Sequence, residues 1–263
     1  MSDLRARKYF GQHFLHDRNI IEKILAAIAP KPDQFFVEIG PGHGALTVPL
    51  LQRCAKIDVI ELDKDLAAKM KVELEDPRLT VHQGDALKFS FETLKTSNSR
   101  MRLVGNLPYN ISSPLLFHIL NSGDLFDDVH VMLQKEVVAR MAATPGNKIY
   151  GRLTVALAAR CNVEPLFNIK PGSFTPPPGV DSTFVRLTPN AAQRARIDNE
   201  IAFDRIIRQA FNMRRKRLAN ALRGLVTEAQ ISALGIDPNV RAEQLHVDSF
   251  IALGNLHAGA AEK

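Results

Sequence analysis

Short β-type runs alternate with helical segments from residue 35 to residue 134, and this alternation limits the possible folds more than any other feature of the chain. The β-type runs are FFVEI, KIDVIEL, LTVHQ, MRLVGN and DVHVMLQ, and helical segments such as Leu66–Leu74 and Leu115–Leu120 separate them. Strands that alternate with helices build a mostly parallel sheet with helices on both faces. The sequence therefore predicts an α/β fold with a Rossmann-like sheet flanked by helices.

Further elements are predicted on both sides of this region. Apolar residues from Ile20 to Ile28 have helical spacing, and Pro30 ends the helix. The stretches Val163–Ile169 and Thr183–Leu187 flank a proline-rich loop and are predicted to pair as a hairpin at the sheet edge. The chain after residue 190 is helical in character. We therefore expect two domains, residues 1–189 with a basic N-terminal arm and residues 190–263 as a small all-helical domain.

Charge and composition narrow the class of protein. The chain has 34 Lys and Arg against 28 Asp and Glu, a net charge of +6 that favours a polyanionic partner. Its two cysteines lack the spacing of a disulfide scaffold, a zinc site or a redox motif. The N-terminus does not resemble a signal peptide, and no stretch of about 18 apolar residues predicts a membrane span. We expect a soluble cytoplasmic protein without a metal.

A glycine-rich turn follows the first strand of the predicted sheet. Gly40, Gly42 and Gly44 have the spacing G-x-G-x-G, whereas a dinucleotide fingerprint has G-x-G-x-x-G and binds a pyrophosphate. The turn therefore suits a ligand without phosphates, and the alternative is a tight strand-to-helix turn with no ligand. Glu61 and Asp85 end the next two strands, where carboxylates can accept hydrogen bonds from ribose hydroxyls and from an adenine amino group. Their convergence on one crevice favours a nucleoside cofactor over loop-capping roles.

The tetrapeptide Asn106-Leu107-Pro108-Tyr109 directly follows the fourth strand. An aromatic amine is a poor nucleophile because its lone pair is delocalised into the ring. The side-chain oxygen of Asn106 and the carbonyl of Leu107 can accept its two N–H groups and free that lone pair for attack. Pro108 fixes the backbone, and the ring of Tyr109 offers a stacking face for an extruded base. The alternative is a proline-containing turn with a core tyrosine.

The proline-rich loop contains Phe174, which is predicted to form a second aromatic wall facing Tyr109 across the base. The alternative for this loop is a stiff connection between two strands.

The densest charge asymmetry lies between Asp204 and Glu228, where no acidic residue occurs. Helices broken near Asn212 would present a basic ridge suited to phosphate contacts, and the alternative is a solvated helix face. The N-terminal arm is expected to extend this track. The predicted RNA-binding residues are Arg5, Arg7, Lys8, Arg205, Arg208, Arg214, Arg215, Lys216, Arg217 and Arg223.

Seven segments together resemble the ribosomal RNA adenine N6-dimethyltransferases, and within that family the small-subunit (16S) rRNA dimethyladenosine transferase type. The segments are KYFGQHFL, VEIGPGHGALT, IELD, GDA, NLPYNISSP, FTPPPGVDS and FNMRRKRLANAL, and they span nearly the whole chain. The resemblance implies a class I methyltransferase domain that uses S-adenosylmethionine and releases S-adenosylhomocysteine. The residues expected at the cofactor are His13, Leu15, Gly40, Gly42, Glu61, Asp85, Ala86 and Asn106.

The same resemblance implies a reaction and a partner. The enzyme would dimethylate N6 of two adjacent adenosines in a hairpin loop near the 3′ end of small-subunit rRNA during ribosome biogenesis. Residues 106–109 and Phe174 would hold the target base. The expected partner is small-subunit rRNA within a pre-assembled 30S particle, no membrane is involved, and the chain is expected to be a monomer.

Three alternatives remain open at this stage. A large-subunit rRNA dimethyltransferase of the antibiotic-resistance type resembles the first domain, although the FNMRRKRLANAL and PPPGVDS segments favour the small-subunit type. A DNA adenine methyltransferase would need a duplex-reading element that the sequence does not contain. A non-enzymatic assembly factor could keep the fold, but the intact acidic residues and the 106–109 loop argue against it.

Overall fold

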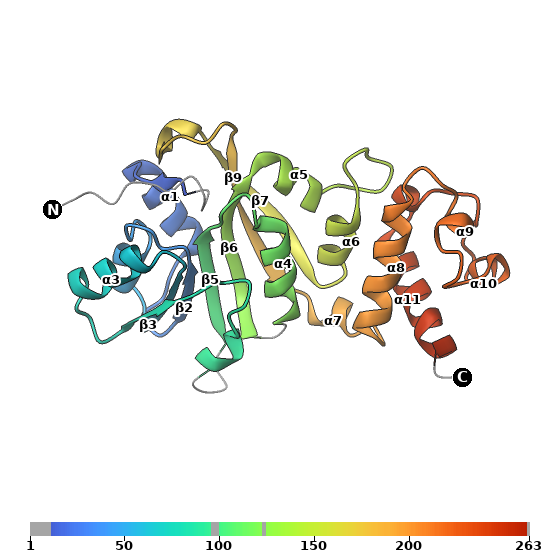
Figure 1. Cartoon of the computed structure of the whole chain (residues 1–263), viewed down its shortest axis with the longest axis horizontal. Helices are drawn as coiled ribbons and strands as arrows, with labels where there is room; N and C mark the ends of the chain where they lie inside the picture. Colours follow the sequence, from blue (N-terminus) through green and yellow to red (C-terminus); the bar gives the residue numbers. More distant parts are fainter. Residues whose placement is uncertain (1–11, 96–99, 123–124, 262–263) are drawn as a thin grey trace. The chain divides into compact units, whose positions relative to one another are not determined.

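The computed structural model describes residues 12–95, 100–122 and 125–261, and the chain separates into two compact units (Figure 1). The first unit runs to Val138 and includes Glu164–Pro189, and the second contains Ala139–Val163 and the chain from Asn190 onward. Residues 139–163 therefore belong to the second unit, whereas the predicted division into 1–189 and 190–263 placed them in the first domain.

The physical reason for this difference is a buried arginine. Helix α6 (Arg152–Ala158) packs against α8 (Glu200–Asn212) and α11 (Val247–Ala261). Arg160 follows α6, is almost fully buried, and forms ion pairs with Glu200 and with Asp204, the latter at 2.9 Å. A buried guanidinium needs such partners, and both of them come from α8.

The first unit is built on a seven-stranded sheet with the order β4-β3-β2-β5-β6-β9-β7. The pairs β3 with β4, β2 with β3, β2 with β5 and β5 with β6 are parallel, and β9 pairs antiparallel with β6. The α/β fold class predicted from the alternating runs is confirmed. The strands are β2 (Phe35–Ile39), β3 (Lys56–Glu61), β4 (Leu79–Gln83), β5 (Met101–Asn106), β6 (Phe126–Gln134), β7 (Cys161–Ile169) and β9 (Ser182–Pro189).

The predicted hairpin at the sheet edge is also present. β7 is the edge strand and lies beside β9. Thr183 of β9 bonds to Asn168 of β7, and Arg186 further along β9 pairs with Glu164 nearer the start of β7. The two contacts occur in opposite order along the strands, so the pairing is antiparallel.

Residues at both ends of α1 (Arg18–Ile28) account for where this helix of the first unit begins and ends. In α1 the side chain of Asp17 accepts hydrogen bonds from the first-turn N–H groups, and Ala29, whose φ is 48°, caps the C-terminus of the helix. The other helices are α2 (Thr47–Leu51), α3 (Lys64–Glu73), α4 (Ser112–Asn121) and α5 (Lys135–Met141), with 3-10 turns η2 (Phe91–Leu94) and η4 (Pro171–Ser173). The three helical segments predicted in this region correspond to α1, α3 and α4.

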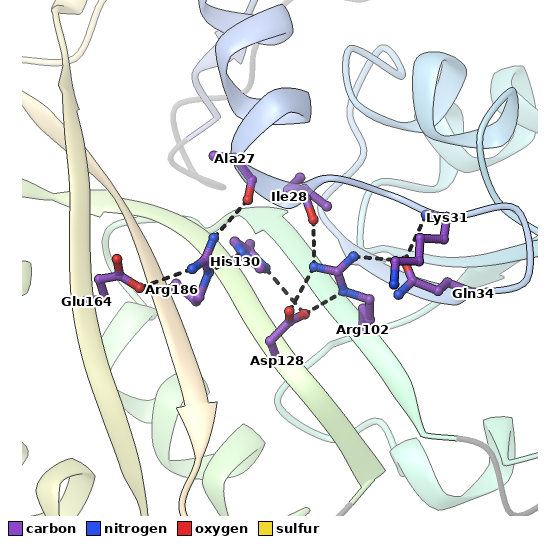
Figure 2. Close-up of polar contacts among 9 residues, drawn as sticks. All are labelled: Ala27, Ile28, Lys31, Gln34, Arg102, Asp128, His130, Glu164 and Arg186. Carbon is purple, nitrogen blue, oxygen red and sulfur yellow. Dashed lines mark hydrogen bonds and ion pairs between the residues drawn. The ribbon is translucent and has the colours of Figure 1, made fainter.

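Two arginines from the sheet hold the C-terminal end of α1 (Figure 2). The guanidinium of Arg102 on β5 donates to the carbonyl of Ile28 at 2.7 Å and forms two bonds with Asp128 on β6. Arg186 on β9 donates to the carbonyl of Ala27 at 2.9 Å. The last carbonyls of a helix lack partners within the helix and carry partial negative charge. The two side chains therefore satisfy these carbonyls and anchor α1 on the sheet.

A second, two-stranded sheet joins the N-terminal segment to the proline-rich loop. β1 (Phe14–Leu15) pairs antiparallel with β8 (Phe174–Thr175), so that Phe14 is opposite Thr175 and Leu15 is opposite Phe174. The sequence did not predict this pairing, because strands of two residues have no recognisable period.

The second unit is helical, as predicted for residues after 190. From residue 190 to residue 261 the chain contains helices and turns and no strand. Its core includes Phe203, Ile207 and Phe250, which are fully buried. The remaining helices are α7 (Ala191–Arg194), α9 (Leu218–Ala221), α10 (Glu228–Ala233) and the 3-10 turn η5 (Ala242–Gln244). In the described part of the chain, no helix has the length and apolar character needed to cross a bilayer.

Candidate active site

A cavity of about 380 Å³ lies in the first unit at the carboxyl ends of β2, β3, β4 and β5. Segments that follow these four strands line it together with residues 12–15. Among the described residues that line it, none is Lys or Arg. The predicted site residues found on its wall are His13, Leu15, Gly40, Gly42, Glu61, Asp85, Ala86, Asn106, Leu107, Pro108 and Tyr109.

The glycine-rich turn borders the cavity in a conformation that favours glycine. Gly40, Gly42 and Gly44 have φ values of 67°, 56° and 81°. A Cβ atom on Gly42 would lie 2.8 Å from the ring of Phe14. The turn therefore leaves main chain exposed to the cavity and lets the N-terminal segment pack closely over it.

Two of the predicted carboxylates already accept main-chain hydrogen bonds. Glu61 accepts from the N–H of Gly42 at 3.2 Å and from the N–H of Asp63 at 2.9 Å. Burial raises the pKa of Glu61 above its ordinary value, against these hydrogen bonds. Asp85 accepts from the N–H of Leu87 at 2.9 Å. A carboxylate has about four acceptor positions, so both side chains keep capacity for a ligand.

The cavity wall has a third carboxylate, Glu38, which was not predicted from the sequence. Glu38 on β2 is fully buried and accepts a hydrogen bond of 2.7 Å from the hydroxyl of Thr47. Burial, and to a lesser extent the nearby charge of Glu61, raise the pKa of Glu38 to about 7. The signal that would have found it is a single acidic residue inside the apolar run FFVEI.

The 106–109 loop is fixed by bonds at its beginning. Asn106, the last residue of β5, donates from its Nδ2 to the carbonyl of His13 at 2.7 Å, so its Oδ1 is available as an acceptor. The N–H of Leu107 donates to the carbonyl of Met132 on β6 at 3.3 Å. These hydrogen bonds leave Oδ1 of Asn106 free to accept a hydrogen bond at the end of β5.

The two predicted aromatic walls differ in position. Tyr109 borders the cavity, and its hydroxyl forms a hydrogen bond with Ser182. Phe174 is only 2% exposed, packs in the hydrophobic core cluster with Leu15, and is not among the residues that line the cavity. The pairing of β8 with β1 directs the Phe174 side chain into the core. The structure therefore does not place Phe174 opposite Tyr109 on the cavity wall, and its contact with a target base stays a prediction.

In the second unit, the seven predicted basic residues between Asp204 and Glu228 are all exposed. Helix α8 ends at Asn212, where a break was expected, and Arg205 and Arg208 lie on its exposed positions. Arg214 is paired with Glu243 at 2.7 Å, and Arg217 donates to Asn239. Arg5, Arg7 and Lys8 lie outside the described residues.

Among the described residues, no group of three or more His, Cys, Asp and Glu side chains has an arrangement that could hold a metal ion.

Comparison with known proteins gives consistent matches over the chain. A family model described as ribosomal RNA adenine dimethylase matches residues 3–258. The chain is 52% identical over 250 residues to the ribosomal RNA small subunit methyltransferase A of Nitrosococcus oceani, covering 95% of each chain. It is 50% identical over 259 residues to the protein of the same name from Pseudomonas aeruginosa, covering 97% of each.

Solved structures show the same architecture. A dimethyladenosine transferase from Plasmodium falciparum has a TM-score of 0.78 and 29% identity, over 94% of this chain and 98% of that one. A 23S rRNA methyltransferase has a TM-score of 0.68 over 92% of this chain and 98% of that one, and at 22% identity this likeness shows the fold alone.

Proposed function

Because the chain belongs to the ribosomal RNA adenine dimethylase family, we propose that it methylates N6 of two adjacent adenosines in a hairpin loop near the 3′ end of 16S rRNA. The methyl donor is S-adenosylmethionine and the products are dimethyladenosines, made in the cytoplasm during ribosome biogenesis. The observation that carries the proposal is one cavity bordered by the glycine turn, the carboxylates Glu61 and Asp85, and the 106–109 loop.

The cavity wall fits the proposed donor. Carboxylates at successive strand ends suit the ribose hydroxyls and adenine amine of a nucleoside. The described wall has no Lys or Arg that would indicate a phosphate site. Glu61, Asp85 and the main chain at Gly40 and Gly42 would hold the donor, which supplies an electrophilic methyl group when bound.

The 106–109 loop would act on the target amine. In the first transfer, Oδ1 of Asn106 and the carbonyl of Leu107 would accept the two N–H groups of the amine, which frees the nitrogen lone pair from conjugation and stabilises the positive charge that develops. The N–C bond would form as the S–C bond of the donor breaks, S-adenosylhomocysteine would leave, and the methylated nitrogen would release a proton to water. The second transfer would repeat these steps with the one N–H that remains. The ring of Tyr109 stacks on the extruded base, a contact worth about 1–3 kcal/mol. Alignment of the amine for attack contributes a further ~7–11 kcal/mol to lowering the barrier.

The basic ridge would bind RNA phosphates. Its residues are exposed on the second unit, as phosphate contacts require. An RNA loop or distorted strand is the expected target, since a base inside an intact helix cannot enter a pocket. We also propose that the substrate is 16S rRNA within an assembled 30S particle and that the enzyme acts as a monomer.

Sequence similarity favours the small-subunit substrate over the large-subunit alternative. The relatives named as small-subunit methyltransferases are 50–52% identical to this chain, whereas the 23S rRNA methyltransferase is 22% identical. The intact site residues favour an enzyme over a non-enzymatic assembly factor.

Transfer of tritiated methyl groups onto small subunits that lack the modification tests the proposal. We expect label on small subunits and none on large subunits or on small subunits already methylated. Mass mapping of 16S rRNA from cells without the protein should show two adjacent adenosines without their methyl groups. Label on large subunits would favour the alternative substrate, and no label on any RNA would favour the assembly factor.

A further inference from the structure

A buried hydroxyl lies behind the ring of Tyr109. Ser182 is the first residue of β9, its Cα is paired with that of Gln134 on β6, and its side chain is fully buried. Its Oγ forms a hydrogen bond with the hydroxyl of Tyr109, 73 positions away in the sequence. Ser182 is therefore anchored in the sheet and contacts a residue of the cavity wall, Tyr109.

Tyr109 needs such an anchor because it lies outside regular structure. Residues 107–111 connect β5 to α4 through a turn, and the ring is partly buried. Burial raises the pKa of the Tyr109 hydroxyl, so this group is protonated at neutral pH. A hydroxyl that loses water on burial destabilises the fold unless it has another hydrogen-bond partner. The bond to Ser182 therefore favours one position of the ring.

The loop between β7 and β9 makes a second polar contact at the same wall. The carbonyl of Pro176 accepts a hydrogen bond of 2.7 Å from Nδ1 of His13, whose ring lies 5.5 Å from the ring of Tyr109. The aromatic residue of this loop, Phe174, packs into the core instead. The loop therefore contacts the cavity wall through the carbonyl of Pro176, which bonds to His13, and not through an aromatic ring.

We propose that Ser182 is a positioning residue that holds the ring of Tyr109 in the plane required to stack on the target base. This inference rests on the proposed function, since it concerns the same site. Ser182 does not itself border the cavity, so it acts through Tyr109.

The first test compares Ser182→Ala with Ser173→Ala. Ser173 is a matched control because it is also a buried serine, lies in the connection between β7 and β9, and loses one side-chain hydrogen bond on replacement, to Asp17 at 3.0 Å. We expect Ser182→Ala to lower kcat for methyl transfer at least ~10-fold, because small misplacements of a reacting group are costly, and to leave donor affinity within about twofold. Ser173→Ala should keep kcat within about twofold of the wild type.

A double-mutant cycle with Tyr109→Phe tests whether the effect passes through the hydroxyl pair. We expect Tyr109→Phe and the double variant to have the same kcat, because Ser182 has no partner left to position. Independent, additive losses would overturn the proposal, and so would an unchanged kcat in Ser182→Ala.

A spectroscopic test needs no turnover. The chain has three tyrosines and no tryptophan, so ¹³Cζ-labelled tyrosine gives a simple NMR spectrum in which Tyr109→Phe identifies one signal. That signal should shift in Ser182→Ala and remain in place in Ser173→Ala. An unshifted signal would overturn the role of Ser182 even if the wild type proved inactive on rRNA, an outcome that would count against the proposed function instead.

Discussion

The side-chain amide of Asn106 donates a 2.7 Å hydrogen bond to the main-chain carbonyl of His13. The bond joins the end of β5 to the segment before β1, two positions 93 residues apart in the sequence. It decides the orientation of the carboxamide, because the donor end is occupied and the Oδ1 acceptor is left for a ligand.

Replacement of Asn106 by Ala should remove this acceptor. We expect methyl transfer to fall by about 100-fold or more, since groups that stabilise developing charge have effects of this size. Donor binding should stay within a few-fold, because Glu61 and Asp85 are retained. Equilibrium dialysis with the donor, alongside single-turnover transfer rates, checks both values. A loss of donor binding equal to the loss of activity would contradict the assignment.

Two neighbouring arginines should contribute unequally to RNA binding. Arg214 is paired with Glu243, whereas Arg215 has no side-chain partner among the described residues. Arg215→Gln should lower affinity and reduce the slope of log K against log salt by about 1, the effect of one lost phosphate contact. Arg214→Gln is the matched control and should change the slope less. Equal slopes for both variants and the wild type would identify this surface as a solvated face.

Gly105 should not tolerate a side chain. It pairs with Ile39 across β2 and β5, and a Cβ at this position would lie 2.7 Å from the carbonyl oxygen of Ile39. Gly105→Ala must therefore shift one of the strands beside the glycine turn. We expect the free energy of unfolding to fall by about 1–3 kcal/mol in urea denaturation. Gly172→Ala, which meets no atom within 4 Å, should be close to neutral.

The raised pKa of Glu38 predicts how stability depends on pH. Burial is the main cause of the shift from 4.5 to about 7, so the folded protein binds this proton more tightly than the unfolded chain. The contribution of Glu38 to stability therefore declines as pH rises from 4.5 to 7 and is constant above that range. Glu38→Gln should remove the decline and make the protein more stable at pH 8 by on the order of 1–3 kcal/mol.

Urea denaturation at pH 5 and pH 8 measures this effect. Glu92→Gln serves as the control because Glu92 is exposed. If the Glu38 and Glu92 variants kept the same pH dependence as the wild type, Glu38 would titrate normally in the folded protein.

Local patterns in the sequence predicted the sheet and the polar residues Glu61, Asp85 and Asn106 of the cavity wall. The runs FFVEI, LTVHQ and MRLVGN became β2, β4 and β5 with the predicted limits. β2 and β5 lie inside the sheet and are almost fully buried, so their runs are largely apolar and can be recognised without knowing their neighbours. Parallel strands also bring their carboxyl ends to one edge, which is why Glu61, Asp85 and Asn106 were expected together and line one cavity.

Contacts between distant segments were decided by the tertiary structure alone. Phe174 entered the core because β8 pairs with β1, residues 139–163 joined the second unit through Arg160, and Ser182 met Tyr109 across 73 positions. A periodic pattern records only whether a residue faces the core or solvent. The partner of a polar group or of a two-residue strand depends on which segments the packed core brings together, and only the folded chain determines that.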